Sequence, residues 1–281
     1  MKNLTYAILG SILLGTIAIF VKLIGSSIPV MTLSFLRAFF AFLFLLVTVP
    51  FIDKNTFRIY KNHLLIFFSI GFLFALTLVM FNMANLLAPV QNVVLINSSS
   101  PLFVLVFAYF VLKEKITRDK LITIGLAFVG LVIINPLQMS SLVGNVLALL
   151  GAVSYGLLLT LMRKEEKCET IGAVMWFFLF ATIVLLPFPF IYGFGNPSTL
   201  DWVFMVLLGA LSTGLAYLLI NLALKEMEAE TSSIITTVTL PLVSIILAVI
   251  IFSEALSFRV ILGGCVLIIS ALYLQFKSLR S

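Results

Sequence analysis

Ten long apolar stretches divide this chain of 281 residues and limit its fold more than any other feature. Most of them reach the roughly 20 residues that an α-helix needs to cross about 30 Å of hydrocarbon, although the fifth and tenth are shorter. The alternation of polar and apolar residues that marks the strands of a membrane barrel is missing. The pattern therefore predicts an all-α polytopic membrane protein with ten transmembrane helices. The stretches are Leu4–Ile24, Val30–Val49, Leu64–Leu86, Ala88–Leu112, Thr117–Pro136, Leu142–Leu161, Ile171–Tyr192, Trp202–Leu224, Ser232–Phe252 and Val260–Leu274.

The composition excludes a soluble protein, because 62% of the residues are apolar and only 10% are charged. A soluble domain carries about 25% charged residues. The first stretch is too long for a cleaved signal peptide and no small-residue cleavage site follows it, so we expect a retained helix. Cys168 falls in a loop and Cys265 inside the tenth stretch, a placement that favours neither a disulfide framework nor a metal site. No cofactor is expected.

The basic residues predict the orientation of the chain in the membrane. With the N-terminus in the cytoplasm, fourteen of the seventeen Lys and Arg lie on the cytoplasmic side. Arg259 is the single one in an outer loop, and Lys22 and Arg37 fall within apolar stretches. The positive-inside rule then places both termini in the cytoplasm and requires an even number of spans. We expect a multi-pass protein of the cell (inner or plasma) membrane, and the net charge of +6 indicates no nucleic-acid partner.

A polar cluster, a proline and a glutamate recur along the chain at one period. Pro101 and Pro241 are 140 positions apart, and so are Glu114 and Glu254. Asn82 precedes Asn221 by 139 positions. This period predicts a duplication into residues 1–138 and 139–281, each with five helices. Because five is odd, the second copy would enter the membrane from the opposite side, which is the inverted-repeat architecture of many secondary transporters.

Several segments in this order resemble the drug/metabolite transporter superfamily, in its EamA-like branch. The resemblance implies ten helices, a cavity between the two halves, and export or exchange of small metabolites. Leu14 departs from it, because many members carry Trp there. The segments that carry the resemblance are Gly15–Lys22, Arg37–Ala41, Ser100–Glu114 with Gly125 and Gly130, Thr213–Tyr217, Asn221–Leu224, and Leu240–Glu254 with Gly263 and Gly264.

These patterns predict a secondary transporter that works by alternating access around a central cavity. Its expected substrates are small metabolites such as amino acids or amphipathic amines and anions. A flippase for lipids or lipid-linked carriers is the alternative. A channel is disfavoured because one chain offers no carboxylate ring or carbonyl filter. An enzyme is disfavoured because His63 is the single histidine and lies in a loop. The expected partners are the substrate and the bilayer, with the chain as a monomer or homodimer.

Pro101 and Pro241 predict kinked helices. Each proline lacks an N–H, which leaves the carbonyl groups of Asn97 and Thr237 without their helical partners. Such a carbonyl is costly in lipid unless another group bonds it. Neighbouring hydroxyl groups could bond back to their own turn, or a polar substrate could supply the donor. Both interpretations are compatible with a broken helix beside a cavity.

Arg37 lies seven residues into its apolar stretch, where an unpaired charge is costly and should face protein or water. Its partner could be an anionic group of the substrate or Glu254. Lys22 is closer to the outer surface and could extend its amine to the headgroups. The topology also places Glu254 with Lys22 at the outer face.

Glu114 falls with Arg163 at the inner face, so each face would hold one glutamate and one cation from different halves. These two pairs are predicted gates that close opposite sides of the protein in turn. Alternatively, all four are helix-end charges that mark the membrane boundary.

The remaining candidates are polar and aromatic residues within the apolar stretches. For the asparagines, hydrogen bonds between helices are the usual role. For tyrosine and tryptophan, anchoring at the membrane surface is the usual role. The predicted substrate-binding residues are Arg37, Asn82, Asn97, Ser100, Tyr155, Trp176, Tyr217, Asn221 and Thr237.

Overall fold

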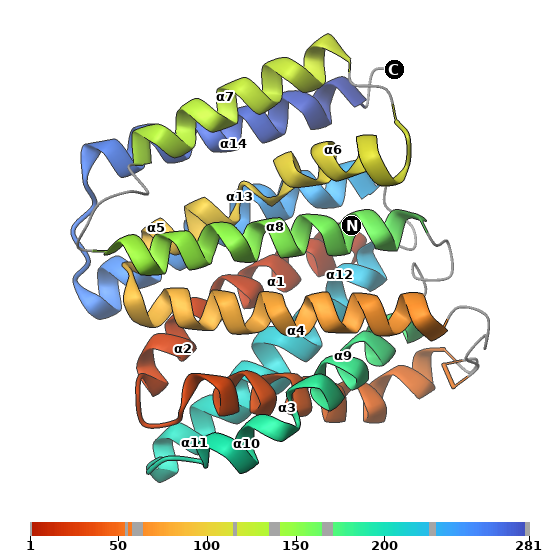
Figure 1. Ribbon diagram of the computed structural model, residues 1–281, viewed down its shortest axis with the longest axis vertical. Coiled ribbons are helices and arrows are strands. Elements are labelled where there is room, and N and C mark those ends of the chain that lie inside the picture. Colours follow the sequence, from red (N-terminus) through yellow and green to blue (C-terminus); the bar gives the residue numbers. More distant parts are fainter. Residues whose placement is uncertain are drawn as a thin grey trace.

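The computed structural model describes residues 2–53, 56–57, 64–114, 117–134, 141–164, 171–224 and 229–278, and within these every regular element is a helix (Figure 1). The helices are α1 (Lys2–Gly15), α2 (Ile17–Ile24), α3 (Val30–Ile52), α4 (Leu64–Leu87), α5 (Val90–Asn97), α6 (Ser100–Val111), α7 (Arg118–Ile134), α8 (Leu142–Lys164), α9 (Ile171–Leu185), α10 (Pro187–Tyr192), α11 (Thr199–Val206), η4 (Leu207–Leu215), α12 (Ala216–Leu224), α13 (Ala229–Phe252) and α14 (Phe258–Ser278). The all-α prediction is confirmed.

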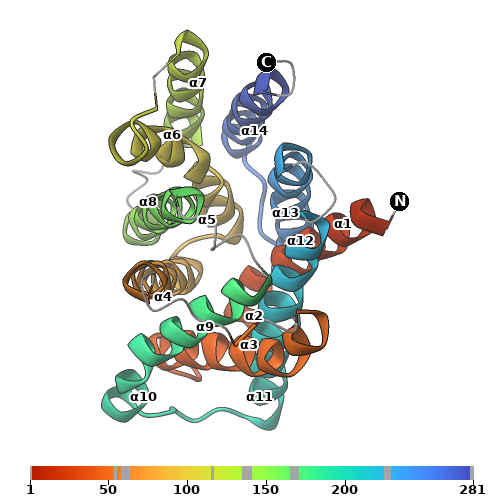
Figure 2. The same cartoon turned by 90° about the vertical axis from the view of Figure 1, so that its right-hand side faces the viewer.

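Helix length and hydropathy give eight candidate membrane spans among the described residues. Four of them join consecutive helices: α1 with α2, α5 with α6, α9 with α10, and α11 with η4 and α12. The apolar cores of α7 and α14, Leu121–Ile133 and Phe258–Ser270, are shorter. They correspond to the fifth and tenth apolar stretches. The structure therefore supports eight crossings by length, and α7 and α14 form a further apolar pair side by side at one edge of the bundle (Figures 1 and 2).

The helices run between two ends of the bundle. We call the end where α1 begins and α14 finishes the terminal end, and the other end, where α2 and α13 finish and α3 and α5 begin, the far end (Figure 1). The largest buried apolar cluster joins α2, α3 and α4 to α8, α9, η4 and α12. The core is therefore shared between helices from both parts of the sequence.

Two spans of the first part are interrupted by polar residues. Thr16 separates α1 from α2, and its hydroxyl donates to the carbonyl of Leu13 at 2.7 Å. Ser98 and Ser99 separate α5 from α6, and their hydroxyls donate to the carbonyls of Val94 at 2.8 Å and Ile96 at 2.6 Å. The same carbonyls also accept the backbone N–H groups of Thr16, Ser98 and Ser99, so each hydroxyl group is satisfied within its own turn.

The two prolines behave differently in the two copies. Pro101 lies in the first turn of α6, where its missing N–H costs no helical bond, so the chain breaks before the proline. Pro241 lies inside α13, which continues through it. The kink predicted for the first copy is thus a break, and the second copy is one uninterrupted helix.

The span formed by α5 and α6 packs against α13 at the far end and separates from it toward the terminal end. At the far end α5 packs against α13. Beyond the break, α6 packs against α8 and α7 instead. Figure 2 shows α6 and α13 on separate sides of the molecule. The break at Ser98 and Ser99 therefore redirects this span.

A π-helical segment, η4, lies in the middle of the eighth apolar stretch and packs closely against α3. A Cβ atom at Gly209 would lie 2.5 Å from the Cβ of Phe40 and 3.1 Å from the carbonyl oxygen of Arg37. Only glycine permits the two backbones to come this close. The π-helix thereby places its polar residues directly against the segment of α3 that carries Arg37.

Candidate functional site

Arg37 is the centre of a buried hydrogen-bond network that joins three helices. It is 4% exposed, although it carries a full charge. Its Nε donates to the hydroxyl of Thr213 on η4 at 3.0 Å. Its Nη1 donates to Oδ1 of Asn82 on α4 at 2.9 Å. The network therefore ties α3 to one helix from each half of the sequence.

The two partners of Arg37 are themselves held in place. Nδ2 of Asn82 donates to the hydroxyl of Ser34 at 2.9 Å, which turns its oxygen toward the guanidinium. The hydroxyl of Thr213 donates to the carbonyl of Leu208 at 2.8 Å, five residues back in the π-helix. Asn82, Thr213 and Ser34 are each fully buried. The position of the guanidinium is therefore set by a preorganised polar shell.

The charge of Arg37 has no carboxylate partner among the described residues. Both ion pairs recorded in this part of the chain involve other cations, Lys22 and Arg163. Glu254, which the sequence offered as one of two partners for Arg37, binds Lys22 instead. Two of the three guanidinium nitrogens donate to neutral side chains, and Nη2 donates to no group of the described residues.

Tyr217 interacts electrostatically with Arg37 and packs against two aromatic side chains. The ring of Tyr217 packs edge-on against Phe74 and Phe178, with centroids 5.4 Å and 5.6 Å away. Phe74 and Phe178 also contact each other at 4.7 Å. The side chain of Tyr155 on α8 interacts with that of Tyr217. Both tyrosines are half-buried, so they extend the polar centre beyond Arg37.

Asn97 ends α5 at the break and faces α8. Its Oδ1 is buried and has no hydrogen-bond donor among the described residues. A Cβ atom at Gly151 would lie 3.7 Å from this oxygen. Gly151 precedes Tyr155 on α8 by four residues, about 6 Å along the helix axis. Ser100 is buried in the first turn of α6, and its carbonyl approaches Gly156.

Three further predicted residues make no hydrogen bond to Arg37 among the described residues. The indole nitrogen of Trp176 donates to the carbonyl of Thr56 at 2.8 Å, beyond the end of α3. This position is about 24 Å along α3 from Arg37, at 1.5 Å per residue. Nδ2 of Asn221 donates to the carbonyl of Tyr217 in its own helix at 2.8 Å. Thr237 is half-buried on α13.

The far end holds an ion pair between Lys22 of α2 and Glu254 after α13. The ammonium of Lys22 also lies 5.1 Å from the ring centroid of Phe252. Glu254 further accepts the backbone N–H groups of Val90 at 3.1 Å and Gln91 at 3.5 Å, at the start of α5. This carboxylate thus connects α2, α5 and α13, and it sits at the positive end of a helix dipole.

The terminal end holds a second ion pair, in which Nη2 of Arg163 lies 2.8 Å from Oε1 of Glu114. Both glutamates follow the same helix ending. Lys113 and Ser253 have φ angles of 57° and 53°, and the next N–H donates six residues back, to Ala108 at 3.2 Å or Ala248 at 3.5 Å. This is the Schellman ending of a helix.

The sequence did not single out several residues that complete the centre. Thr213 and Ser34 are part of the Arg37 network, and Thr16 pairs with Ser212 of η4 at 2.7 Å between hydroxyl oxygens. Thr213 appeared only in a segment of the resemblance. A signal was nevertheless present, because Ser212 and Thr213 are adjacent polar residues inside an apolar stretch.

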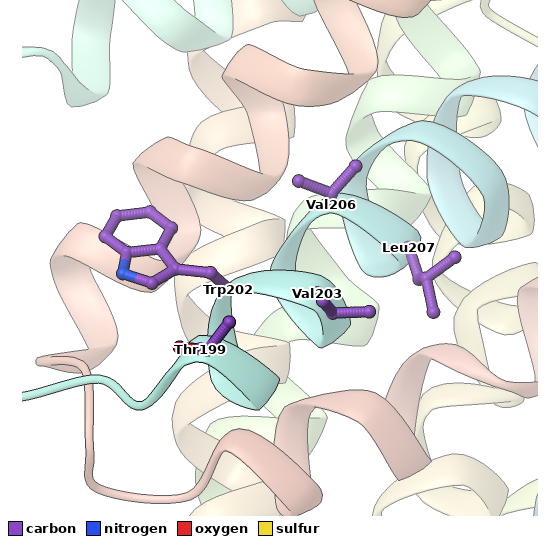
Figure 3. A pocket seen from close by; sticks show the side chains of 5 residues that line it. All are labelled: Thr199, Trp202, Val203, Val206 and Leu207. Carbon is purple, nitrogen blue, oxygen red and sulfur yellow. The ribbon is translucent and has the colours of Figure 1, made fainter.

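An apolar hollow of about 350 Å³ lies beside α11 (Figure 3). It is lined by Thr199, Trp202, Val203, Val206 and Leu207. None of these residues takes part in the hydrogen bonds of Arg37. Because a binding site needs a few well-placed polar groups to orient its ligand, the hollow is a weaker candidate than the Arg37 centre.

Known proteins resemble this chain over almost its whole length. The uncharacterized transporter YetK of Bacillus subtilis (strain 168) is 28% identical over 273 residues, covering 91% of this chain and 81% of that protein. The S-adenosylmethionine uptake transporter of Rickettsia prowazekii (strain Madrid E) is 23% identical over 262 residues, covering 92% and 87%.

One crystal structure covers 100% of this chain and 99% of its own, with a TM-score of 0.69 and 17% identity, which shows a shared fold. The model of the EamA-like transporter family matches twice, over residues 1–135 and 142–276. These two matches together span nearly the entire sequence. The chain belongs to the EamA-like transporter family.

Proposed function

We propose that this chain is a secondary transporter that moves a small metabolite by alternating access, with Arg37 at the centre of its substrate site. The observation that carries the proposal is the buried network of Arg37, Asn82 and Thr213, which draws on both halves of the sequence. A charged group held among neutral partners inside an apolar bundle marks a substrate pathway more often than a structural tie. Exporters and exchangers use such a central site, and so do importers.

The proposal includes ten crossings arranged as two inverted repeats, residues 1–138 and 139–281. Equivalent glycines support the duplication: a Cβ at Gly15 would lie 3.0 Å from the carbonyl oxygen of Leu240, and one at Gly156 would lie 3.0 Å from that of Ser100. Both members of each pair are displaced by about one period, 141 and 140 positions. The double match to the family model supports the same division.

The crossing of α7 decides whether the repeats are inverted. If α7 crosses the membrane, the first half has five spans and the second begins on the opposite side. If it does not, the first half has four spans and the repeats are parallel. The helix has 17 residues, which corresponds to about 25 Å. It runs alongside the other helices from the terminal end to the far end (Figure 1), and this favours crossing.

The two ion pairs fit the role of alternating gates. Lys22–Glu254 closes the far end and Arg163–Glu114 the terminal end, with each pair contributed by two spans. We propose that the terminal end faces the cytoplasm of a cell membrane, as the basic loops predict. Exchanging the charges of Glu254 and Lys22 should restore transport that either single reversal abolishes. Failure of the exchange to restore any transport would contradict the gate.

The transport proposal is tested with the purified protein in proteoliposomes. S-adenosylmethionine is one test compound because relatives carry it, and amino acids and amphipathic amines are the others. The expected result is saturable counterflow of at least one labelled compound when the unlabelled one is preloaded. Counterflow is independent of the driving force, so it also serves an exporter or a facilitated exchanger. Absence of counterflow for every class of compound contradicts the proposal.

A further inference from the structure

The structure points to the class of substrate. Resting on the proposed function, we infer that Arg37 binds a carboxylate or similar anionic group of the transported metabolite, and that organic cations lacking such a group are excluded. The proposal is argued from three features: the uncompensated charge of Arg37, its free donor, and a buried acceptor at the break after α5.

The first feature is the missing counter-charge. Arg37 is 4% exposed, and among the described residues no carboxylate pairs with it, because Glu254 is bound to Lys22 and the N–H groups of α5. The hydrogen bonds that Arg37 donates to Asn82 and Thr213 replace part of its hydration, but these acceptors carry no negative charge. A buried cation in this state attracts an anion strongly and repels a second cation.

The second feature is the arrangement of donors. Nη2 of Arg37 is the guanidinium nitrogen that donates to no described group, while Nε and Nη1 are fixed by their neutral partners. Tyr217 follows Thr213, the partner of Nε, by four residues and can add a hydroxyl donor on the same side of Arg37. A planar guanidinium with a free N–H edge matches the oxygens of a carboxylate.

The third feature is the acceptor at Asn97. Its buried Oδ1 has no donor among the described residues, and it lies against Gly151, one turn of α8 from Tyr155. An unpaired buried acceptor is costly unless a ligand or water bonds it. The same metabolite can satisfy it with an amino or hydroxyl group. A metabolite that carries both a carboxylate and an amino or hydroxyl group, such as a zwitterion or a hydroxy acid, would satisfy both Arg37 and Asn97.

The test compares probes that differ in their carboxylate. Counterflow in proteoliposomes is measured for L-methionine, S-adenosylmethionine and succinate as carboxylates, L-methioninamide and choline as cations, and uridine as a neutral compound. At least one carboxylate should be carried, and L-methioninamide should be carried much more weakly than L-methionine if the latter is a substrate. The half-saturating concentration should rise about 30-fold or more in Arg37→Gln, because a buried charge pair loses one partner.

Two further variants keep the experiment decisive. Arg37→Lys retains the charge without the planar fork and should keep part of the carboxylate flux. Arg259→Gln removes an exposed arginine at the start of α14 and should leave the flux unchanged. Thermal unfolding of each variant in detergent verifies that it is folded before its flux is compared.

The outcomes separate the two proposals. Transport of choline, L-methioninamide or uridine without any carboxylate would overturn the substrate class and leave the transporter function standing. Carboxylate flux in folded Arg37→Gln at the wild-type half-saturating concentration would also overturn the class. Flux of no probe at all would instead contradict the proposed function on which this inference rests.

Discussion

The side chains next to Arg37 determine whether its charge is available to an anionic ligand. Asn82 offers an oxygen to Nη1 because its amide nitrogen is engaged by Ser34. An asparagine at this place solvates the guanidinium without neutralising it. An aspartate would neutralise it permanently and compete with any anionic ligand.

Asn82→Asp should therefore raise the unfolding temperature in detergent and suppress carboxylate transport. The reason is that a buried carboxylate would pair with Arg37 at the position of the present 2.9 Å hydrogen bond. Asn85→Asp on the same helix is the matched control, because the amide nitrogen of Asn85 donates to the carbonyl of Phe81 in its own helix. Undiminished transport by Asn82→Asp would show that Arg37 does not meet the substrate.

Thr213→Val should weaken substrate binding more than Thr213→Ser. Valine removes the acceptor of Nε, while serine retains the hydroxyl. Hydrogen bonds to charged groups contribute about 1.5–3 kcal/mol, so we expect roughly a 10- to 100-fold rise in the half-saturating concentration for valine. Equilibrium binding to the purified variants measures the difference. Equal effects of valine and serine would point to packing as the role of Thr213.

The sequence identified Arg37 as a candidate site residue, but it did not identify the neutral side chains that surround it. Arg37 stood out because a cation in an apolar stretch is costly. Thr213 and Ser34 did not, since hydroxyl residues in membrane helices usually bond to their own backbone. Trp176 was expected at the site because of its ring, but its indole bonds to Thr56 beyond the end of α3.

Among the elements, η4 brings the two halves together at Arg37. Gly209→Ala should lower the unfolding temperature, because its Cβ would lie 2.5 Å from the Cβ of Phe40 and the backbones would have to separate. Overpacking of this kind costs about 1–3 kcal/mol. Gly125→Ala in α7 is the control, since a Cβ there meets no atom within 4 Å. Equal unfolding temperatures for the two variants would contradict the close packing.

The ion pairs at the two ends should differ in strength. Side chains of Lys22 and Glu254 are 30% and 10% exposed, whereas those of Arg163 and Glu114 are 51% and 30% exposed. Exposed pairs contribute about 0–1 kcal/mol and are screened by salt. Glu254→Gln should therefore cost more stability than Glu114→Gln, by about 1–2 kcal/mol. Thermal unfolding at low and high salt measures both; a larger loss for Glu114→Gln would reverse the order.

The places of the apolar helices were predicted better than their continuity. Length and hydropathy located each apolar segment, because crossing a membrane requires about 20 apolar residues. The break at Thr16 has no proline to announce it, and the helix through Pro241 is continuous despite one. Whether a polar residue interrupts a helix depends on partners such as Ser212, which lie far away in the sequence.

At the scale of the whole molecule, whether α7 crosses the membrane distinguishes inverted from parallel repeats. In a variant without native cysteines, Val143→Cys at the start of α8 should react with a membrane-impermeant thiol reagent added outside intact cells. The reason is that an inverted repeat places the beginning of α8 at the far end, which the basic loops assign to the outside. Ser26→Cys, an exposed position between α2 and α3 that precedes α7 in the chain, is the positive control, because its side does not depend on α7. Labelling of Ser26→Cys alone would favour parallel repeats.

The family model matches the chain twice, over residues 1–135 and 142–276. What the sequence could not supply was the arrangement of the spans around Arg37, because a period of 140 residues says nothing about which helices touch. The structure adds that α3, α4 and η4 meet there.

The two short helices α2 and α5 have a mechanical consequence. Each has eight residues, or about 12 Å of stiff rod. Each begins or ends beside Glu254 and has its other terminus at a break in the chain, Thr16 or Ser98. If the Lys22–Glu254 pair opens as the proposed gate does, α2 and α5 lose their shared contact with Glu254 together, and the opposite end of α2 lies next to Ser212 while that of α5 is Asn97.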